Sequence, residues 1–431
     1  MENKLTIAVI GAGASGMTAA IAAARNGAEV TLFEKNDRVG KKILATGNGK
    51  CNLSNLEFST EHYYCQDKDK LKEVFDSFSV WDAVSYFESM GLMMKTKNNS
   101  YLYPYSEQAS SVLDVLRMEL SRCGVKTVAD AEIVHACFNK EKHKFQIKDR
   151  NEKVYYFDKL IISCGSPASL KKGEGMSGYE LAKGFGHRIN PIVPGLVQLK
   201  SGDSFIKALA GVRCQAGIKL MVDGQEMGQE TGEVQFTEYG ISGIPVFQIS
   251  RIAGYALLEN KPVTVLVDFF PEHEEKSYGY MAKLRYEEQK HKTLENYLTG
   301  TQNKKINMVM IKQAGLKPGM KAEELDFKTI WGIMKLYKAF PVHISGINSM
   351  ENAQICAGGV DFREVSCELE SSLVNGLYFT GEILDVDGKC GGYNLQWAWS
   401  SGYVAGRNAA GFHAVKSAEN GEKIKREKTL C

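Results

Sequence analysis

An α/β fold with a doubly wound, Rossmann-like parallel sheet is predicted by features at both ends of this 431-residue sequence. Near the N-terminus, a strand-like apolar run leads into the G-x-G-x-x-G motif of residues 11–16 and then into an alanine-rich helix. A second strand-like run, from Glu29 to Phe33, follows. Near the C-terminus, residues 375–396 carry a buried type of strand, a glycine-rich loop and the start of another helix. Strand, turn and helix in this order are the units of a doubly wound sheet.

The N-terminal glycine motif predicts a dinucleotide site. Gly11 permits the tight turn between strand and helix, and Gly13 lets the backbone approach a pyrophosphate. Gly16 allows the helix to pack closely on the strand. Ala14 and Ser15 open the helix, whose N-terminal amides attract phosphate charge. A glycine-rich turn without a ligand is the alternative, and the flanking strand and helix favour the ligand site.

An acidic residue at the end of the second strand narrows the choice of dinucleotide. Glu34 occupies the position at which a carboxylate accepts hydrogen bonds from ribose hydroxyls. The same charge repels a ribose 2′-phosphate. We therefore expect the adenosine half of FAD or NAD here, rather than NADP, with Lys35 beside it.

The C-terminal segment predicts the far end of an extended cofactor. A cofactor lying over a parallel sheet meets one loop at its adenosine end and needs another strand, loop and helix at its other end. FAD has that length. An acid such as Glu382 or Asp385 suits a ribityl hydroxyl, and a helix from about Tyr393 aims its N-terminus at the flavin pyrimidine edge. A glycine-rich connection between core elements is the alternative.

A second G-x-G-x-x-G occurs at Gly173, Gly175 and Gly178. The residues before it are polar and include Pro167, no strand leads in, and no strand-terminal acid follows. This context favours a surface loop over a second dinucleotide fold.

Between the two chain ends the predicted secondary-structure pattern of the sequence changes twice. From Pro191 to Pro271 short strand-like stretches alternate with turns, which predicts a β-rich inserted domain. Glu272 to Lys328 is charged and helical in pattern, and Ile330 to Phe340 is a further helix candidate. The predicted domains are 1–190 with 350–413 (cofactor-binding), 191–271 with 329–349 (β-rich), 272–328 (helical) and a charged tail, 414–431.

Composition excludes several function classes. Lysine and arginine number 53 against 51 acids, and the net charge of +2 argues against a nucleic-acid partner. The stretch Leu5 to Ala24 lacks charges, but its glycines, threonines and alanines make it a poor membrane span or signal sequence. Ten cysteines without C-x-x-C spacing indicate reduced, cytoplasmic thiols, and neither they nor the eight histidines suggest a metal site. We expect a small-molecule substrate; the oligomeric state is open.

Several motifs together resemble the BaiN-like family of bacterial NAD(P)/FAD-dependent oxidoreductases. Besides residues 11–16 they include Gly40 to Asn52, Gln235 to Gly243, Ala357 to Val360 and Gly381 to Gln396. Lys41 and Lys50 stand where arginine is common in the family. The resemblance covers nearly the whole chain and implies FAD, a doubly wound FAD domain formed by both chain ends, an inserted β-barrel-like domain and a small helical domain.

By this resemblance Glu34 binds the adenosine ribose, the basic loop from Lys42 to Asn52 follows the pyrophosphate and ring, and Gly391 to Leu395 lie beside the flavin. The predicted cofactor contacts comprise Gly11, Gly13, Ala14, Ser15, Gly16, Glu34, Lys35, Lys42, Gly47, Asn48, Gly49, Cys51, Asn52, Gly165, Gly381, Glu382, Asp385, Gly391, Gly392, Tyr393, Asn394 and Leu395.

The family resemblance implies a reductase in which hydride passes from NADH or NADPH through the flavin to a C=C bond conjugated to a carbonyl, with a steroid or bile-acid enone as candidate substrate. A flavin amine or aminoketone oxidase using O2 and a flavin-containing binding protein are the alternatives. No catalytic residue is assigned. Tyr101, Tyr103 and Tyr393 are candidate acids or aromatic walls, although packing roles are favoured for each.

Overall fold

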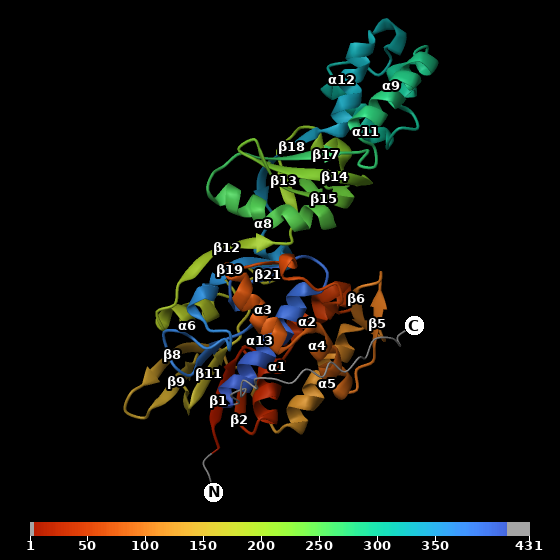
Figure 1. Ribbon diagram of the computed structural model, residues 1–431. Coiled ribbons are helices and arrows are strands. Elements are labelled where there is room, and N and C mark those ends of the chain that lie inside the picture. The colour runs from red at the N-terminus through yellow and green to blue at the C-terminus, as the bar shows by residue number, and fades with distance from the viewer. Residues whose placement is uncertain (1–3, 412–431) are drawn as a thin grey trace.

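A computed structural model describes residues 4–411. Figure 1 shows an α/β body that contains both ends of the described chain, a barrel beyond it, and a group of helices at the far tip. The predicted tail, 414–431, lies outside the described residues. Within the described part, no helix combines the length and apolar character needed to cross a bilayer.

The body is built on a five-stranded parallel sheet. Its strand order is β20-β11-β1-β2-β7, and every neighbouring pair is parallel. Ile7, Ala8 and Val9 of β1 are fully buried, as expected of a strand covered on both faces. The Rossmann-like prediction is thus confirmed. The strands are β1 (Thr6–Ile10), β2 (Glu29–Phe33), β7 (Lys126–Val128), β11 (Lys159–Ile162) and β20 (Leu377–Phe379).

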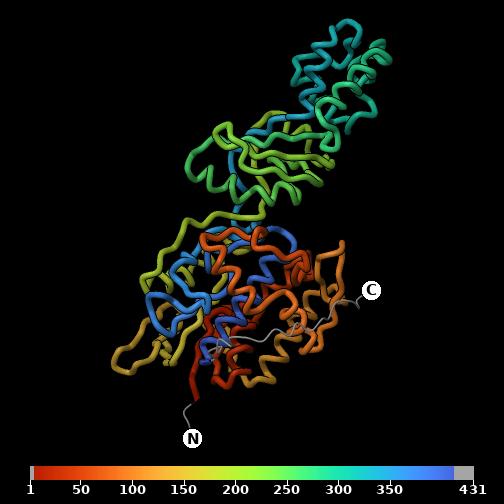
Figure 2. Tube along the Cα trace, in the orientation of Figure 1, coloured from red at the N-terminus to blue at the C-terminus, as the bar shows by residue number. Residues whose placement is uncertain are grey.

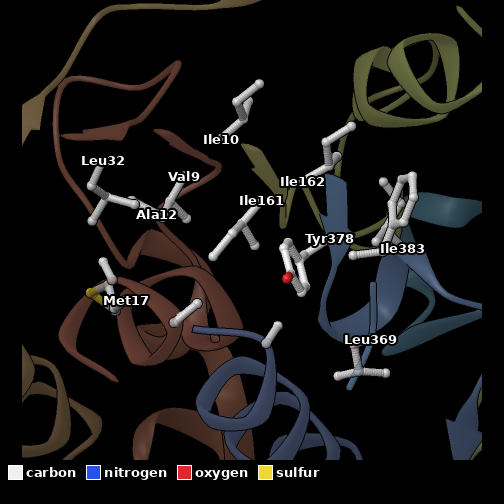
Figure 3. Packing of buried hydrophobic residues seen from close by; sticks show 14 of the residues in the cluster. Val9, Ile10, Ala12, Met17, Leu32, Ile161, Ile162, Leu369, Tyr378 and Ile383 are labelled. Atoms are coloured by element: carbon white, nitrogen blue, oxygen red, sulfur yellow. The ribbon is translucent and has the colours of Figure 1, made fainter. Parts of the chain in front are cut away.

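Two helices from opposite ends of the sequence pack together against this sheet. They are α1 (Ala14–Arg25) and α13 (Tyr393–Ala409), and Figure 1 shows them side by side. Figure 3 shows Val9, Ile161 and Tyr378 of the sheet in the core above Met17 of α1. The N-terminal and C-terminal segments therefore form one hydrophobic core.

Further elements cover the rest of the body. Residues 68–89 form two helices, because α3 ends at Ser77 and Ser79 caps the next helix through a capping box with Asp82. The elements are α2 (Lys41–Ala45), α3 (Lys68–Ser77), α4 (Val80–Ser89), α5 (Ala109–Arg122), α6 (Ser177–Gly184), β3 (Ser54–Asn55), β4 (Tyr63–Tyr64), β5 (Met94–Lys97), β6 (Tyr101–Pro104), β8 (Ile133–Asn139), β9 (Lys144–Asp149), β10 (Val154–Phe157) and β21 (Asp387–Gly388).

The inserted segment forms a closed antiparallel barrel with strand order β13-β16-β15-β14-β17-β18. Figure 2 shows the chain leaving the body and later returning to it, along β12 (Ile189–Gly195) and β19 (Ile355–Val360), which pair antiparallel. The barrel strands are β13 (Leu199–Ser201), β14 (Arg213–Val222), β15 (Gln225–Phe236), β16 (Gly240–Ser242), β17 (Val263–Asp268) and β18 (Phe340–Ile347), with the short helix α7 (Ile206–Leu209).

The β-rich prediction missed a helix on the barrel. Helix α8 (Ile244–Leu258) has Pro245 in its first turn and lies between the barrel and the body (Figure 1). Its sequence is apolar nearly all round because it contacts both β12 and the barrel strands, so no amphipathic period marks it.

The tip contains α9 (Glu275–Gln289), α10 (Leu294–Leu298), α11 (Lys304–Gln313) and α12 (Phe327–Lys338). Helix α12 packs on α9 and α11. We therefore place the return to the barrel at β18, later than the predicted residue 329.

Candidate cofactor site

A long cleft lies at the carboxyl ends of β1, β2 and β11, the edge at which open α/β sheets bind ligands. The space between its walls, including the part open to solvent, amounts to ≈ 1380 Å³. One end is lined by Glu34 and Ala131, and the other by Val386 and Leu395. The cleft thus joins the two glycine-rich regions that the sequence singles out.

The glycine motif forms the floor of the cleft, and a different physical requirement explains the glycine at each of its three positions. Gly11 has φ +98°, and a Cβ there would lie 2.5 Å from the Ser163 carbonyl oxygen. A Cβ on Gly16 would lie 1.9 Å from the Gly11 carbonyl oxygen, so Gly16 is needed for packing. A Cβ on Gly13 would meet no described atom within 4 Å. Packing does not require glycine at position 13, whereas close approach of a ligand does.

The N-termini of two long helices face the cleft without side-chain caps. Helix α1 begins after Gly13 and helix α13 after Gly392, and neither has an acidic residue in its first turn. Ala14 and Ser15 of α1, and Asn394 and Leu395 of α13, line the cleft. Both ends therefore present free amides and the positive end of a helix dipole to whatever binds there.

Glu34 is held in place at the β2 end of the cleft. It is 8% exposed, its Oε2 accepts a hydrogen bond from the Ala12 amide at 3.0 Å, and its Oε1 accepts one from the Asn36 amide at 2.9 Å. A carboxylate with two oxygens retains lone pairs for ribose hydroxyls.

Lys42 and Glu382 meet across the middle of the cleft, with Nζ 2.7 Å from Oε2. Oε1 of Glu382 accepts a hydrogen bond from the Cys356 amide at 2.9 Å. The pair joins the basic loop to the C-terminal segment, and it leaves a lysine ammonium beside the α1 N-terminus, where phosphates bind well.

The two glycine-rich segments also contact each other directly. A Cβ on Gly392 would lie 2.6 Å from the Ser54 carbonyl oxygen, and one on Gly391 would lie 2.9 Å from the Tyr101 ring. The Asn55 side-chain amide donates to the Gly391 carbonyl at 3.1 Å. Beside them, Asn52 Oδ1 is buried and has no hydrogen-bond partner among the described residues. An unpaired buried acceptor next to the cofactor cleft indicates a missing donor.

Half of the predicted contacts line the cleft itself. These are Gly11, Gly13, Ala14, Ser15, Glu34, Lys35, Lys42, Gly165, Glu382, Asn394 and Leu395. Around them, and not in the lining, are Gly16, Gly47, Asn48, Gly49, Cys51, Asn52, Gly381, Gly391, Gly392 and Tyr393. The Tyr393 hydroxyl donates to the Glu57 carbonyl at 3.1 Å, which is a packing role.

Asp385 lies outside the cleft. Its Oδ1 accepts from the Gly358 amide at 3.1 Å, and its Oδ2 from the Asn190 amide group at 2.8 Å. Its carboxylate is used to hold β12 and β19, so we omit it from the proposed cofactor contacts.

The sequence did not indicate some lining residues, notably Gln354 and Ile355 at the start of β19. No motif marks them, because they reach the cleft only after the inserted barrel closes. The second glycine motif follows loop residues rather than a strand, as predicted, but it is only partly a surface loop: Gly175 lines the cleft, and Gly178 is buried in α6.

Burial keeps the nearby thiols and phenols protonated. It raises the pKa of Cys51 to about 11 and the pKa of Cys164 and of Cys356 to about 12. It also raises the pKa of Tyr101 and of Tyr103. The thiols are therefore poor nucleophiles, and the phenols are proton donors at neutral pH.

Comparison with known proteins decides the family. The model of the HI0933-like protein Rossmann domain matches residues 5–408. The chain belongs to the HI0933-like family. It is 41% identical over 407 residues to a 3-dehydro-bile acid delta(4,6)-reductase of Clostridium scindens, covering 94% of this chain and 98% of the relative. The resemblance to the BaiN-like oxidoreductases is confirmed, and this HI0933-like protein is an enzyme of the FAD-dependent oxidoreductase class.

Other relatives are more distant. A ribosomal RNA dihydrouridine synthase of Haemophilus influenzae is 31% identical over 403 residues, covering 92% of this chain and 96% of the relative. Among solved structures, a 3-ketosteroid-delta4-(5alpha)-dehydrogenase from Rhodococcus jostii aligns over 94% of this chain and 97% of its own, at 13% identity and a TM-score of 0.47.

Proposed function

We propose that this protein is an NAD(P)H-dependent reductase of a C=C bond conjugated to a carbonyl, with steroid-like enones as its substrates. The observation that carries the proposal is the continuous cleft from Glu34 to Leu395, in a chain 41% identical to a 3-dehydro-bile acid delta(4,6)-reductase. The proposed cofactor is FAD, because the cleft joins a dinucleotide motif to a second helix N-terminus.

The residues fit FAD at each part of the cleft. Glu34 would suit the adenosine ribose, the α1 amides and Lys42 would suit the two phosphates, and Glu382 would suit a ribityl hydroxyl. Bound FAD would supply hydride transfer between the reduced nicotinamide and the enone. The free N-terminus of α13 would stabilise negative charge at the pyrimidine edge of a bound flavin, an effect worth about 0.3–2 kcal/mol.

The protein must also deliver a proton to the carbon next to the carbonyl. Tyr101 and Tyr103 lie on β6, where Tyr101 meets Gly391 and the Tyr103 ring lies 3.7 Å from a Cβ built on Gly47. Because burial raises the pKa of both phenols, they carry a proton at neutral pH. We assign them as the aromatic wall of the substrate site and as its candidate proton donors.

Anaerobic stopped-flow spectroscopy tests the proposal. NADH or NADPH should bleach the 450-nm flavin band of the holoenzyme, and a steroid 4-en-3-one should restore it, with the saturated ketone as product. Bleaching by an amine alone, with peroxide formed on admitting air, would establish the oxidase instead. Protein that folds but fails to bind FAD would refute both.

A second candidate follows from the dihydrouridine synthases in the family. The uracil C5–C6 bond is also a C=C bond conjugated to a carbonyl, so similar chemistry would act on RNA. The near-neutral net charge argues against an RNA substrate. Incubating the holoenzyme and NADPH with unmodified ribosomal RNA, and measuring dihydrouridine, separates the two.

A further inference from the structure

The hairpin β5–β6 carries an alternating basic and aromatic face. Lys95 pairs with Tyr103 and Lys97 with Tyr101 across the two strands. Because side chains alternate along a strand, these four lie on one face, and Leu102 is buried on the other. The Lys97 ammonium lies 5.4 Å from the centre of the Tyr103 ring.

Three lysines on and beside this face converge on one carboxylate. Glu107 Oε1 lies 2.7 Å from Lys95 Nζ, and its Oε2 lies 2.6 Å from Lys97 Nζ and 3.4 Å from Lys50 Nζ. These contacts lower the pKa of Glu107 to about 2, so it is ionised at any working pH. Three ammonium groups and one carboxylate leave a surplus of two positive charges, held together before any ligand arrives.

The charged face lies near the cofactor cleft. Thr46 lines the cleft, a Cβ built on the neighbouring Gly47 would lie 3.7 Å from the Tyr103 ring, and the Lys97 ammonium lies 5.4 Å from the centre of that ring. Lys50 belongs to the same loop as Thr46. All three lysines remain partly exposed, with side-chain exposures of 52% for Lys50, 31% for Lys95 and 35% for Lys97.

The proposed donor has no other dinucleotide fold to bind. In residues 4–411 there is one parallel sheet, and its glycine motif faces the FAD cleft. A nicotinamide dinucleotide must therefore be held by side chains near the reactive end of the cleft. Its diphosphate carries two negative charges, and its two flat bases stack well on exposed aromatic rings.

We propose that Lys95 and Lys97 of the β5–β6 face, together with Lys50 beside it, bind the diphosphate of the reduced nicotinamide dinucleotide. The inference rests on the proposed function, because it supplies the donor site that the proposed reaction needs. Two surplus positive charges match the diphosphate, and Glu107 holds the three lysines together when the donor is absent.

The experiment uses FAD-loaded enzyme and measures bleaching of the flavin by NADH and NADPH under anaerobic conditions. The double variant K95Q/K97Q should raise the donor Kd roughly tenfold while leaving the limiting bleaching rate at saturation nearly unchanged. Its Kd should also depend less on salt. The control K219Q/K304Q removes two lysines from exposed ion pairs with Glu226 and Glu295, away from the body, and should leave the donor Kd unchanged.

A variant that is expected to strengthen donor binding guards against a loss of affinity that is caused only by misfolding. E107Q removes the carboxylate, adds one positive charge to the face, and should lower the donor Kd by about two- to fivefold.

Unchanged donor Kd in both K95Q/K97Q and E107Q would overturn the donor site while leaving the reductase function in place. A higher KM for an acidic enone alone, or loss of RNA binding alone, would assign the lysines to another ligand and also overturn it. If neither nucleotide bleaches the wild-type flavin, although dithionite-reduced enzyme still reduces the enone, the donor part of the proposed function fails and this site with it.

Discussion

Arg251 of the barrel and Asp387 of the body form an ion pair, with Nε 2.9 Å from Oδ1. Asp387 is 3% exposed and directly follows Val386, which lines the cleft. The Arg251 guanidinium also lies over the Tyr64 and Tyr255 rings, at 4.7 and 5.0 Å from their centres. The barrel therefore holds the segment that leads into α13.

This pair predicts a pH-dependent stability. Burial raises the pKa of Asp387 to about 7, against the opposing effect of Arg251. Between the usual aspartate pKa and about 7 the folded state holds a proton that the unfolded state has released, so stability falls as pH rises through this window. In D387N this fall in stability should disappear. The variant should therefore become more stable relative to wild type as the pH rises toward 8. Thermal unfolding from pH 4 to pH 8 measures the effect.

Glu230 offers a matched control, because it pairs with Lys389 at 3.4 Å in the same interface but is partly exposed. E230Q should change stability by less than about 1 kcal/mol and keep the pH dependence of wild type. An identical pH slope in D387N and wild type would show that Asp387 titrates normally.

Glu34 should set the affinity for the adenosine half of FAD. E34Q keeps the shape of the side chain but loses the charge and one acceptor oxygen. The variant therefore loses the hydrogen bond from either the Ala12 amide or the Asn36 amide, and it loses contacts with the ribose. We expect FAD to bind the apoprotein at least about tenfold more weakly, since hydrogen bonds to charged groups are worth about 1.5–3 kcal/mol. E29Q, at the exposed start of the same strand, should bind like wild type in a flavin-fluorescence titration.

Lys42 should make the FAD affinity depend on salt. If its ammonium faces the cofactor phosphates, K42Q weakens binding and flattens the rise of the FAD Kd with ionic strength. K72Q is the control, because Lys72 pairs with the exposed Asp76 on α3 and does not line the cleft. Equal salt slopes for K42Q and wild type would place Lys42 in a purely structural pair with Glu382.

The features of this molecule that could be predicted from the sequence are those determined by a few neighbouring residues. The turn at Gly11, the acid at the end of β2 and the helix from Tyr393 each follow from backbone geometry or periodicity within a few residues. The structure brings these segments to one cleft although most of the chain separates them.

The parts that were missed depend on contacts made after folding. Helix α8 is buried on two sides and so lacks an amphipathic period, and Gln354 enters the cleft only through the pairing of β12 with β19. Asp385 was assigned to the cofactor by its position after a strand, but Gly358 and Asn190 occupy its carboxylate. The convergence of Lys50 with the β5–β6 hairpin joins distant segments, which charge counting alone does not reveal.

Close packing of α1 on α13 links stability to cofactor binding, because both helices aim their N-termini at the cleft. A Cβ on Gly406 would lie 2.2 Å from the Ala19 carbonyl oxygen, a backbone atom that cannot move aside cheaply. G406A should therefore push the helices apart, cost about 1–3 kcal/mol of stability and weaken FAD binding. Gly332 in α12 provides the control, because a Cβ there meets no described atom within 4 Å. G332A should gain about 0.4–1 kcal/mol and leave FAD binding unchanged. Urea unfolding with and without FAD measures both quantities, and a stable G406A with wild-type FAD affinity would show that the two helices separate without disturbing the cleft.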